Sequence, residues 1–507
     1  MGERTDYGTV IVGTGFSGLG MAIQLKKEGR HDFVVLEKAH DVGGTWRDNT
    51  YPGCACDIQS HMYSFSFEQN PDWTRSFSGQ AEIWDYLRGV ADKYDLRKHI
   101  RFGVEVTGAE WDGETATWRV ATGDGRTFRA RYLVSGIGGL HIPNVPALPG
   151  IEKFKGETFH SARWNHDYDL AGKRVAVVGT GASAIQFVPR IAPEVGELHL
   201  FQRTPPWVMP KPDHAMPQWS KTLFQKVPGA QRLYRNFLYW LLEVRAVGFN
   251  GHPGLLKAAQ KLAELNIRRN VKDRELRRKL TPDYVMGCKR VLIANDYYPT
   301  FNRDNVHLVT DGVAEVRAHS IVDSAGVERE VDAIIYGTGF HVTDGYDYLS
   351  ITGRDGRDLA KEWRTNGIHT HNGITVSGFP NLFFLLGPNT ALGHNSVVFM
   401  IESQIRYVAD AMKVTERNGA DTIEVRSAAQ QAFNEEIQRK LENGVWTQGG
   451  CKSWYLDAKG VNRTIWPGFT FRYWARTRKV EPSDFELVSS RAHRDPAPRR
   501  RGKKIPA

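Results

Sequence analysis

Two glycine-rich stretches, each preceded by a run of β-branched residues, could bind phosphates. The first, TVIVGTGFSGLGMAIQL, places Gly13, Gly15 and Gly18 at the G-x-G-x-x-G spacing. In a strand–loop–helix unit these glycines make the turn, admit a pyrophosphate and let the helix pack on the strand, and the helix N-terminus faces the phosphates. The expected second strand, FVVLEK, carries Glu37, whose carboxylate can accept hydrogen bonds from a ribose diol. This order predicts a dinucleotide site, and an ordinary glycine turn is the weaker interpretation.

The same arrangement recurs in KRVAVVGTGASAIQFV, where Gly179, Gly181 and Ala184 follow a second β run. The strand after it, LHLFQRT, contains Arg203 where the first unit has its acid. An arginine at this place suits a 2′-phosphate, so we expect this site to prefer NADPH over NADH. The economical pairing is FAD in the first site and NADPH in the second. We predict no metal site.

The length and composition predict the number of domains and the class of protein. A chain of 507 residues with 41% hydrophobic and 24% charged residues is expected to form two or three globular domains. The net charge is +10, but the last 17 residues, RAHRDPAPRRRGKKIPA, carry +6 of it. We therefore predict a basic disordered tail over 491–507, of unknown role, and no nucleic-acid binding.

The cysteines and the apolar runs indicate in which cellular compartment the protein is expected. Four cysteines, with only Cys54 and Cys56 close together, favour a reduced, cytoplasmic protein without structural disulfides. The one-residue gap between Cys54 and Cys56 favours buried spectators over a redox dithiol. Nothing resembles a signal peptide, and the apolar run FLYWLLEVRAVGF is too short and too charged to span a bilayer.

The stretch between the two glycine loops identifies a family. FKGETFHSARWN supplies Phe154, Gly156, His160 and Trp164, and it resembles the F-x-G-x-x-x-H-x-x-x-W fingerprint of type I Baeyer–Villiger monooxygenases, which are class B flavoprotein monooxygenases. Asn165 departs from the Pro or Asp that follows in the fingerprint. The resemblance, which extends from about Tyr7 to about Leu487, implies that this stretch is a linker into the NADPH domain. It implies that His160 organises the linker as the domains move, and a merely structural histidine is about equally supported.

The resemblance also implies roles for individual residues. Arg290 resembles the catalytic arginine, Asp57 its acidic partner, and Trp454 a tryptophan of a mobile C-terminal segment that closes over NADP. The residues that we expect at FAD are Gly13, Gly15, Phe16, Ser17, Gly18, Glu37, Gly44, Thr45, Trp46, Asp57, Tyr63 and Val397. Those that we expect at NADP are Gly179, Thr180, Gly181, Ala182, Ser183, Ala184, Arg203, Thr204, Lys289, Arg290 and Trp454.

An α/β fold with two Rossmann-like domains and a helical insertion follows. The expected FAD domain is split into 1–145 and 378–490, and the NADPH domain into 150–210 and 288–377. The insertion, 212–287, either shapes the substrate pocket or simply packs as a helical cap. The segments YLVSGIGGLHIPNVPALPG and VDAIIYGTGF are expected where the chain crosses between the domains.

The activity that the resemblance implies is a Baeyer–Villiger oxidation. NADPH reduces FAD, oxygen forms a C4a-peroxyflavin, and one oxygen atom is inserted beside a ketone carbonyl to give an ester or lactone. A permanently charged guanidinium at Arg290 would stabilise the peroxide anion with fixed donors. The alternatives are an N- or S-oxygenating flavin-containing monooxygenase and, less favoured because a vicinal dithiol is absent, a flavin disulfide reductase. The particular ketone, the regioselectivity and the oligomeric state cannot be predicted from the sequence.

Overall fold

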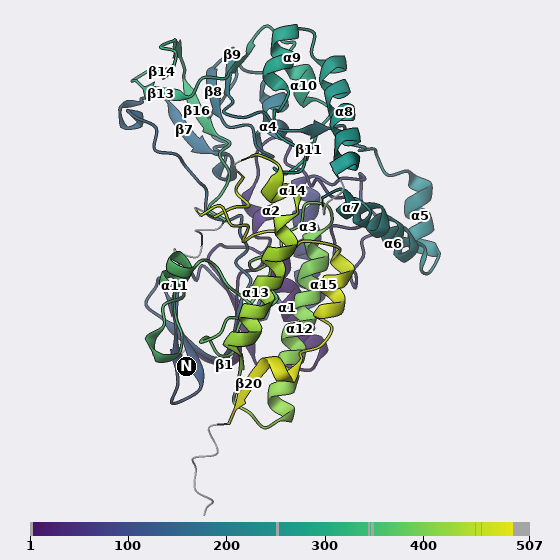
Figure 1. The fold of residues 1–507 in the computed structure, drawn as a ribbon, viewed down its shortest axis with the longest axis vertical. Helices are drawn as coiled ribbons and strands as arrows, with labels where there is room; N and C mark the ends of the chain where they lie inside the picture. Colours follow the sequence, from purple (N-terminus) through teal and green to yellow (C-terminus); the bar gives the residue numbers. More distant parts are fainter. Residues whose placement is uncertain are drawn as a thin grey trace, which may run out of the picture.

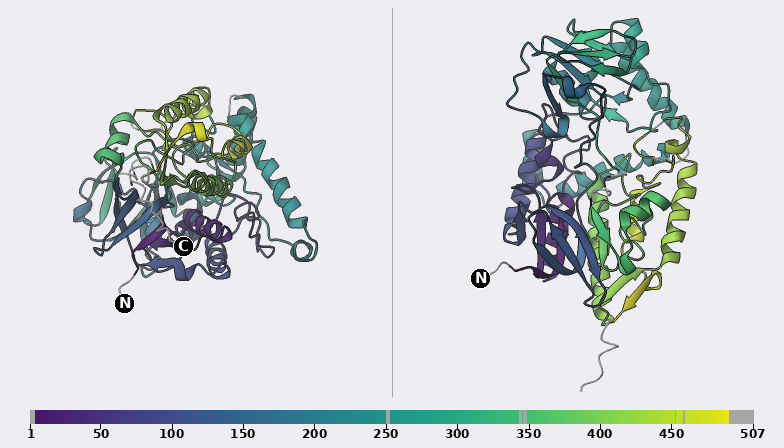
Figure 2. Two further views of the ribbon diagram at one scale, coloured as in Figure 1. Left: turned by 90° about the horizontal axis from the view of Figure 1, so that it is seen from below. Right: turned by 90° about the vertical axis from the view of Figure 1, so that its left-hand side faces the viewer.

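The computed structural model describes residues 4–249, 253–342, 345, 349–451, 453–457 and 459–489, so the predicted tail at 491–507 lies outside the described residues. Two α/β units lie one above the other along the long axis of the molecule (Figures 1 and 2). Each unit is built on its own sheet with a parallel core, as the two glycine motifs predict.

The lower unit in Figure 1 contains an eight-stranded sheet in the order β17-β4-β5-β6-β1-β2-β3, with β18 paired to β6. Its strands are β1 Asp6–Val12, β2 Phe33–Glu37, β3 Ile100–Phe102, β4 Val106–Asp112, β5 Thr117–Thr122, β6 Thr127–Ser135, β17 Ser350–Thr352 and β18 Leu382–Phe384. The pairs β1–β2, β1–β6 and β2–β3 are parallel, whereas β4–β5 and β5–β6 form an antiparallel extension. The buried run in β1 fills the core on both faces, as expected for a central parallel strand.

The helices of the lower unit come from both ends of the chain. They are α1 Phe16–Lys27, α2 Thr45–Asp48, α3 Gln80–Lys93, α11 Leu359–Asn366, α12 Val397–Arg417, α13 Ser427–Glu442, α14 Val445–Gln448 and α15 Thr470–Arg476. A Cβ at Gly20 of α1 would lie 2.6 Å from the side chain of Ile405 in α12, so the small residues of α1 permit close helix packing. Strands β19 Thr422–Val425 and β20 Phe485–Val488 pair near the C-terminal end.

The upper unit contains a five-stranded, all-parallel sheet in the order β12-β9-β8-β16-β7. Its strands are β7 Glu157–His160, β8 Arg174–Val178, β9 Glu197–Phe201, β12 Val306–Val309 and β16 Ala333–Tyr336. Helix α4 (Ala184–Ile191) follows β8, and α10 (Tyr297–Thr300) packs against α4. A small antiparallel sheet contains β13 Val313–Val316, β14 Ser320–Asp323 and β15 Glu328–Glu330, and β10 Val208–Met209 pairs with β11 Leu292–Ile293.

The chain crosses between the two units at the two predicted segments, and these crossings are hydrogen-bonded to each other. Asn144 N donates to Gly339 O over 2.9 Å, and His341 N donates to Ile142 O over 3.0 Å. Pro143 and Phe340 form an antiparallel bridge. The two crossings therefore form a short two-stranded connection.

The predicted start of the second FAD-domain part at residue 378 is wrong. Strand β17 pairs in parallel with β4 of the first sheet, and α11 packs on β17, so the chain has rejoined the lower unit by Ser350. The boundary was missed because a three-residue strand gains its identity from a distant hydrogen-bonding partner and carries no periodicity of its own.

A helical segment lies between β10 and β11. It contains α5 Gln218–Lys226, α6 Ala230–Glu243, α7 Ala246–Phe249, α8 Pro253–Asn270 and α9 Arg274–Leu280. Helices α5 and α6 lie together at the right-hand side of Figure 1, away from both sheets, while α8 packs near β10 and α10.

Candidate active site between two nucleotide loops

The first glycine loop has the geometry of a phosphate cradle. A Cβ at Gly18 would lie 1.8 Å from the carbonyl oxygen of Gly13, so no other residue fits where α1 meets the loop. Helix α1 begins after Gly15 with no side-chain cap, which leaves its first amide groups available to an anion. Gly43 N donates to Thr14 O over 3.0 Å and brings the GG pair at 43–44 against this loop. The loop therefore fits a dinucleotide pyrophosphate.

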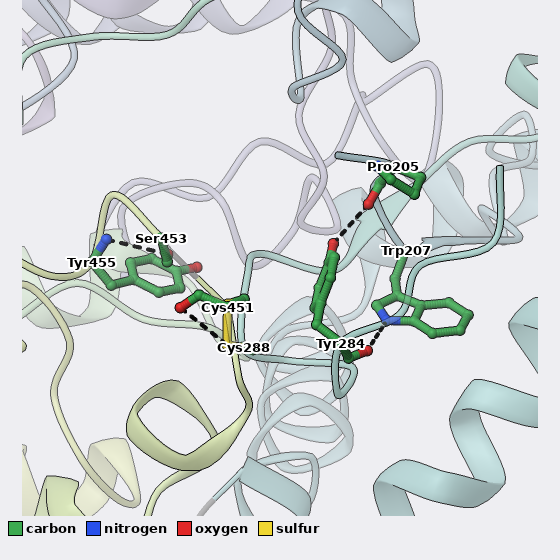
Figure 3. The surroundings of a disulfide bond; sticks show 7 residues. All are labelled: Pro205, Trp207, Tyr284, Cys288, Cys451, Ser453 and Tyr455. Atoms are coloured by element: carbon green, nitrogen blue, oxygen red, sulfur yellow. Dashed lines mark hydrogen bonds between the residues drawn. A yellow bond between two sulfur atoms is a disulfide. The ribbon is translucent and has the colours of Figure 1, made fainter. Parts of the chain in front are cut away.

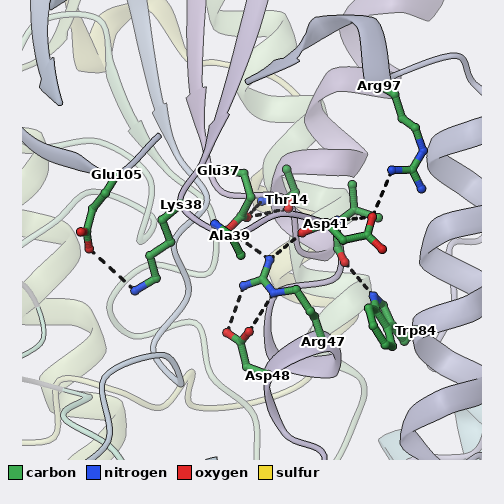
Figure 4. Close-up of polar contacts among 11 residues, drawn as sticks. Thr14, Glu37, Lys38, Ala39, Asp41, Arg47, Asp48, Trp84, Arg97 and Glu105 are labelled. Carbon is green, nitrogen blue, oxygen red and sulfur yellow. Dashed lines mark hydrogen bonds and ion pairs between the residues drawn. The ribbon is translucent and has the colours of Figure 1, made fainter. Parts of the chain in front are cut away.

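Glu37 is buried at the end of β2 and organises the loops on either side of it (Figure 4). One carboxylate oxygen accepts from Thr14 N at 3.0 Å and Thr14 Oγ1 at 2.6 Å. The other accepts from Ala39 N at 2.9 Å and lies 3.1 Å from the guanidinium of Arg47. Glu37 thus fixes the glycine loop beside it.

Three aromatic side chains lie where the flavin is expected. Trp46 Nε1 donates to Tyr63 Oη over 3.2 Å, and the rings of Phe16 and Tyr63 meet edge-on with centroids 5.2 Å apart. Burial raises the pKa of Tyr63 far above its ordinary value, so this hydroxyl stays protonated. Thr45 begins α2, and Val397 is the first residue of α12, after the capping residue Ser396.

The second glycine loop repeats the close approach of backbone to backbone. Gly179 has a φ of +104°, and a Cβ there would lie 2.5 Å from Gly337 O. Residues 180–183 lie between β8 and α4, and Thr180 Oγ1 donates to Thr204 O over 3.3 Å. This contact connects the loop to the segment after β9, which carries Arg203.

Arg203 and Lys289 are neighbouring cations. The pKa of Lys289 is lowered, first by burial and then by the charge of Arg203, while Asp283 partly offsets both effects. In the described ranges of the chain, no carboxylate forms an ion pair with either side chain. Two adjacent cations without an anion fit a phosphate group at this position.

Arg290 and Asp57 form an ion pair across the two units. Nε and Nη2 of Arg290 donate to the same oxygen, Oδ2, of Asp57, over 3.0 and 2.6 Å. The negative charge of Asp57 raises the pKa of Arg290 above its ordinary value. The loop with Asp57 is held against α4, because Gln186 accepts from Tyr51 Oη at 2.9 Å and donates to Ala55 O at 2.9 Å.

A cavity of about 410 Å³ opens beside this ion pair. Its lining is mostly apolar and comes from β10, from the insertion and from the loop before α12; among its residues are Met209, Phe249, Leu256, Met286 and Leu392. Asp57 and Arg290 are the charged pair in its wall. An apolar cavity with a few polar groups at one point is typical of a small-molecule site.

The fingerprint segment is an edge strand of the upper sheet, with Phe154 and Gly156 before it and Trp164 after it. A Cβ at Gly156 would lie 2.3 Å from Asp332 O, which explains the glycine. Trp164 packs between Phe159 and Phe187, with centroids 5.1 and 5.2 Å away. His160 ends β7, and burial lowers its pKa to about 4, so the ring is neutral at physiological pH.

The prediction of a protein without disulfides is wrong, because Cys288 and Cys451 are joined (Figure 3). The bond connects the residue before Lys289 to the segment with Trp454 and Tyr455. The two cysteines are 163 residues apart in the sequence, and a disulfide depends on tertiary proximity, so no local pattern indicated this bond. Cys54 and Cys56 form no disulfide: Cys56 is buried as expected, Cys54 is half-buried, and burial raises the pKa of Cys54 to about 12.

Comparison with known proteins places these features in one family. The flavin-binding monooxygenase-like family matches residues 8–351 of the chain. The chain belongs to this family. It is 52% identical to a Baeyer–Villiger monooxygenase of Pseudomonas aeruginosa over 95% of this chain and 91% of the relative. It is 48% identical to one of Streptomyces coelicolor, over 94% and 92%.

Solved structures resemble this flavin-binding monooxygenase-like chain closely. A cyclohexanone monooxygenase from a Rhodococcus species, bound to NADP+, matches with a TM-score of 0.86 and 30% identity over 96% of this chain and 100% of its own. A steroid monooxygenase bound to NADP matches with a TM-score of 0.86 and 32% identity, with the same coverage. These matches agree with the predicted fold of two dinucleotide-binding units.

The structure adds residues to the site of this monooxygenase that sequence reasoning missed. Tyr455 is buried, its pKa is raised to about 12 by burial, and the charge of Arg290 opposes that shift. Lys211 lies near Asp57 and over the Phe77 ring, with its ammonium 5.1 Å from the centroid, and burial lowers its pKa. Tyr455 directly follows the predicted Trp454 in the sequence, and this is the one signal that could have suggested it. No sequence signal marks Lys211.

Proposed function

We propose that this chain is an FAD-containing, NADPH- and O2-dependent Baeyer–Villiger monooxygenase with its reaction centre at Arg290 and Asp57. The overall reaction converts a ketone, O2, NADPH and a proton into an ester or lactone, NADP+ and water. The observation that carries the proposal is the ion-paired Arg290 in the wall of the apolar cavity, within a chain of this family. The named relatives do not favour N- or S-oxygenation.

Residues of this chain would hold both cofactors. The first glycine loop, α1 and Glu37 would bind FAD, and the second glycine loop with Arg203 and Lys289 would bind NADPH. When bound, FAD reduced by NADPH supplies the activation of oxygen. Because Arg203 and Lys289 would be neutralised by a 2′-phosphate, the same pair would discriminate against NADH.

Arg290 would supply fixed positive charge where the reaction develops negative charge. A guanidinium does not lose its proton, and its planar donors can hold an oxygen anion or an amide. Asp57 would keep the guanidinium oriented through Nε and Nη2, which leaves Nη1 free of this contact. The apolar lining would exclude water and hold the hydrocarbon part of a ketone against this charge.

A ketone panel tests the proposal. Purified protein should be yellow and release FAD on denaturation. Cyclic, linear, aryl and steroid ketones are then incubated with NADPH, and NADPH consumption and product mass are recorded on the same samples. An ester or lactone 16 mass units, roughly one oxygen atom, heavier than its ketone is expected. NADPH oxidation with no oxygenated product from any ketone, but with an oxygenated amine or sulfide in parallel samples, would overturn it.

A further inference from the structure

The hairpin of α5 and α6 carries large apolar side chains on its outer side. Leu233, Phe237 and Trp219 are 72%, 61% and 70% exposed. We define the outer apolar face as Trp219, Leu223, Val227, Leu233, Phe237, Trp240, Leu241 and Val244. The ring of Trp240 lies 6.1 Å from that of Phe471 in α15, which extends the face onto the neighbouring helix. Contiguous exposed apolar side chains of this size mark an interaction surface.

The spacing along α6 shows that this face is separate from the one that packs inward. Leu238 and Leu242 are buried on one side of the helix, together with Arg235 and Glu243. Leu233, Phe237 and Trp240 follow each other at intervals of four and three on the other side. A surface helix that only covers a core carries polar residues on its outer side, so packing of a cap does not account for α6.

The charges on the hairpin select the kind of partner. Between Asp213 and Glu264 the sequence has one acidic residue, Glu243, and it is buried. Exposed cations accompany the apolar side chains: Lys226 on α5, Arg232 on α6 and Arg245 directly after α6. Asp72 contacts α5 from a neighbouring loop, where it accepts from Gln225 over 2.5 Å. Two copies meeting through these faces would bring like charges together, whereas an anionic surface would neutralise them.

We propose that the outer apolar face docks onto an anionic phospholipid bilayer. A helix that lies in a membrane interface has Trp, Phe and Leu on one side and Lys or Arg along its flanks, which is the composition of α5 and α6. In the described part of the chain, no helix is long and apolar enough to cross a membrane. The hairpin would therefore lie on the bilayer, with its apolar side chains among the lipid headgroups and upper acyl chains.

The face is continuous with the cavity beside Arg290. Val244 belongs to the outer apolar face and also lines the cavity, as does the neighbouring Arg245. A lipophilic ketone dissolved in the bilayer would meet the mouth of the cavity at the docked surface. This route rests on the proposed function, whereas the docking itself does not.

Vesicle sedimentation tests the docking. The holoenzyme is mixed with vesicles of phosphatidylcholine alone and of phosphatidylcholine with phosphatidylglycerol, at low and high salt. Binding is expected to the vesicles with phosphatidylglycerol and to weaken with salt. The double variant Leu233→Ser/Trp240→Ser should bind about tenfold or more weakly, because two large side chains no longer enter the interface. Lys226→Glu/Arg232→Glu should lose the preference for the anionic lipid.

The matched control is Val327→Ser/Val488→Ser, two exposed apolar residues outside the insertion and outside the crossings. It should bind like the parent. FAD content and conversion of a water-soluble ketone should be unchanged in all variants, which separates loss of docking from misfolding and from failure of the proposed function. Equal sedimentation with both vesicle types would overturn the proposal. So would a dimer of the parent, seen by light scattering, that the Leu233→Ser/Trp240→Ser variant abolishes, because the occupant would then be a second copy.

Discussion

Arg290 and Asp57, 233 residues apart in the sequence, share a single carboxylate oxygen through two guanidinium nitrogens. The acid comes from a loop of the lower unit, and the arginine lies between the insertion and β11. The pair is therefore complete only when both units are in place. Its position in the cavity wall makes it the first target for substitution.

Replacing Arg290 should separate reduction from oxygenation. In Arg290→Ala, NADPH should still bleach the flavin, while ester formation should fall by about 10²-fold or more because a preorganised charge is lost. Hydrogen peroxide should accumulate in its place. Arg290→Lys should rescue poorly, since an ammonium lacks the planar fork. Single-turnover absorbance with product analysis measures both steps, and ester formation at the parental rate by the alanine variant would remove Arg290 from the reaction.

Replacing Arg203 should affect one coenzyme only. Loss of a charge-assisted contact should cost about 1.5–3 kcal/mol of NADPH binding. The KM for NADPH should therefore rise at least several-fold in Arg203→Ala, while use of NADH stays nearly constant. Arg268→Ala, at an exposed position on α8, is the matched control. An equal loss with both coenzymes would contradict the assignment of the 2′-phosphate site.

Removing the Cys288–Cys451 bond should weaken the fold. A cross-link over 163 residues restricts the unfolded chain strongly, so Cys451→Ser should lower the free energy of unfolding by about 2–4 kcal/mol. The thermal midpoint of the variant should fall, and a thiol reductant should lower that of the parent to the same value. Cys54→Ser is the control, because Cys54 is unpaired. Four reactive thiols in the denatured, unreduced parent, rather than two, would show that the bond does not form.

Buried histidines should make the protein sensitive to acid. Burial lowers the pKa of His61, His160, His199 and His371 to about 4, whereas an unfolded histidine titrates near 6.5. The unfolded chain therefore binds more protons below that pH, and stability falls as the pH drops from about 6.5 towards 4. Between pH 7 and 5.5 each such histidine should remove about 1 kcal/mol.

Thermal midpoints at constant ionic strength between pH 7 and 5.5 measure this dependence. His371→Gln should flatten the curve, because a glutamine takes up no proton on unfolding, whereas the histidine released from burial does. His319→Gln, at an exposed position, should leave the curve unchanged. A midpoint for the parent that does not move over this range would contradict the expected proton linkage.

Local patterns predict the two nucleotide units well, because a strand, a glycine loop and a helix follow one another in each. β1, α1 and β2, and then β8, α4 and β9, lie where those patterns place them. The pairing of Arg290 with Asp57 came from resemblance, since nothing local joins residues so far apart. The Cys288–Cys451 bond, the pairing of β17 and the position of Lys211 near Asp57 depend on residues far away in the sequence. No local sequence pattern could predict them. The aromatic residues of α6 were expected to shape the pocket or pack a cap; Tyr234 and Tyr239 are half-buried, whereas Phe237 and Trp240 are exposed.

The paired crossings at Ile142–Asn144 and Thr338–His341 have a mechanical consequence. A hydrogen-bonded two-stranded ribbon can bend, but its two strands cannot slide past each other. Because the crossings are hydrogen-bonded to one another, the two units are joined at this place by one short ribbon rather than by two independent linkers, and a rotation of the upper unit would have its hinge there. A nucleotide carried on the upper sheet would therefore travel on an arc about this ribbon.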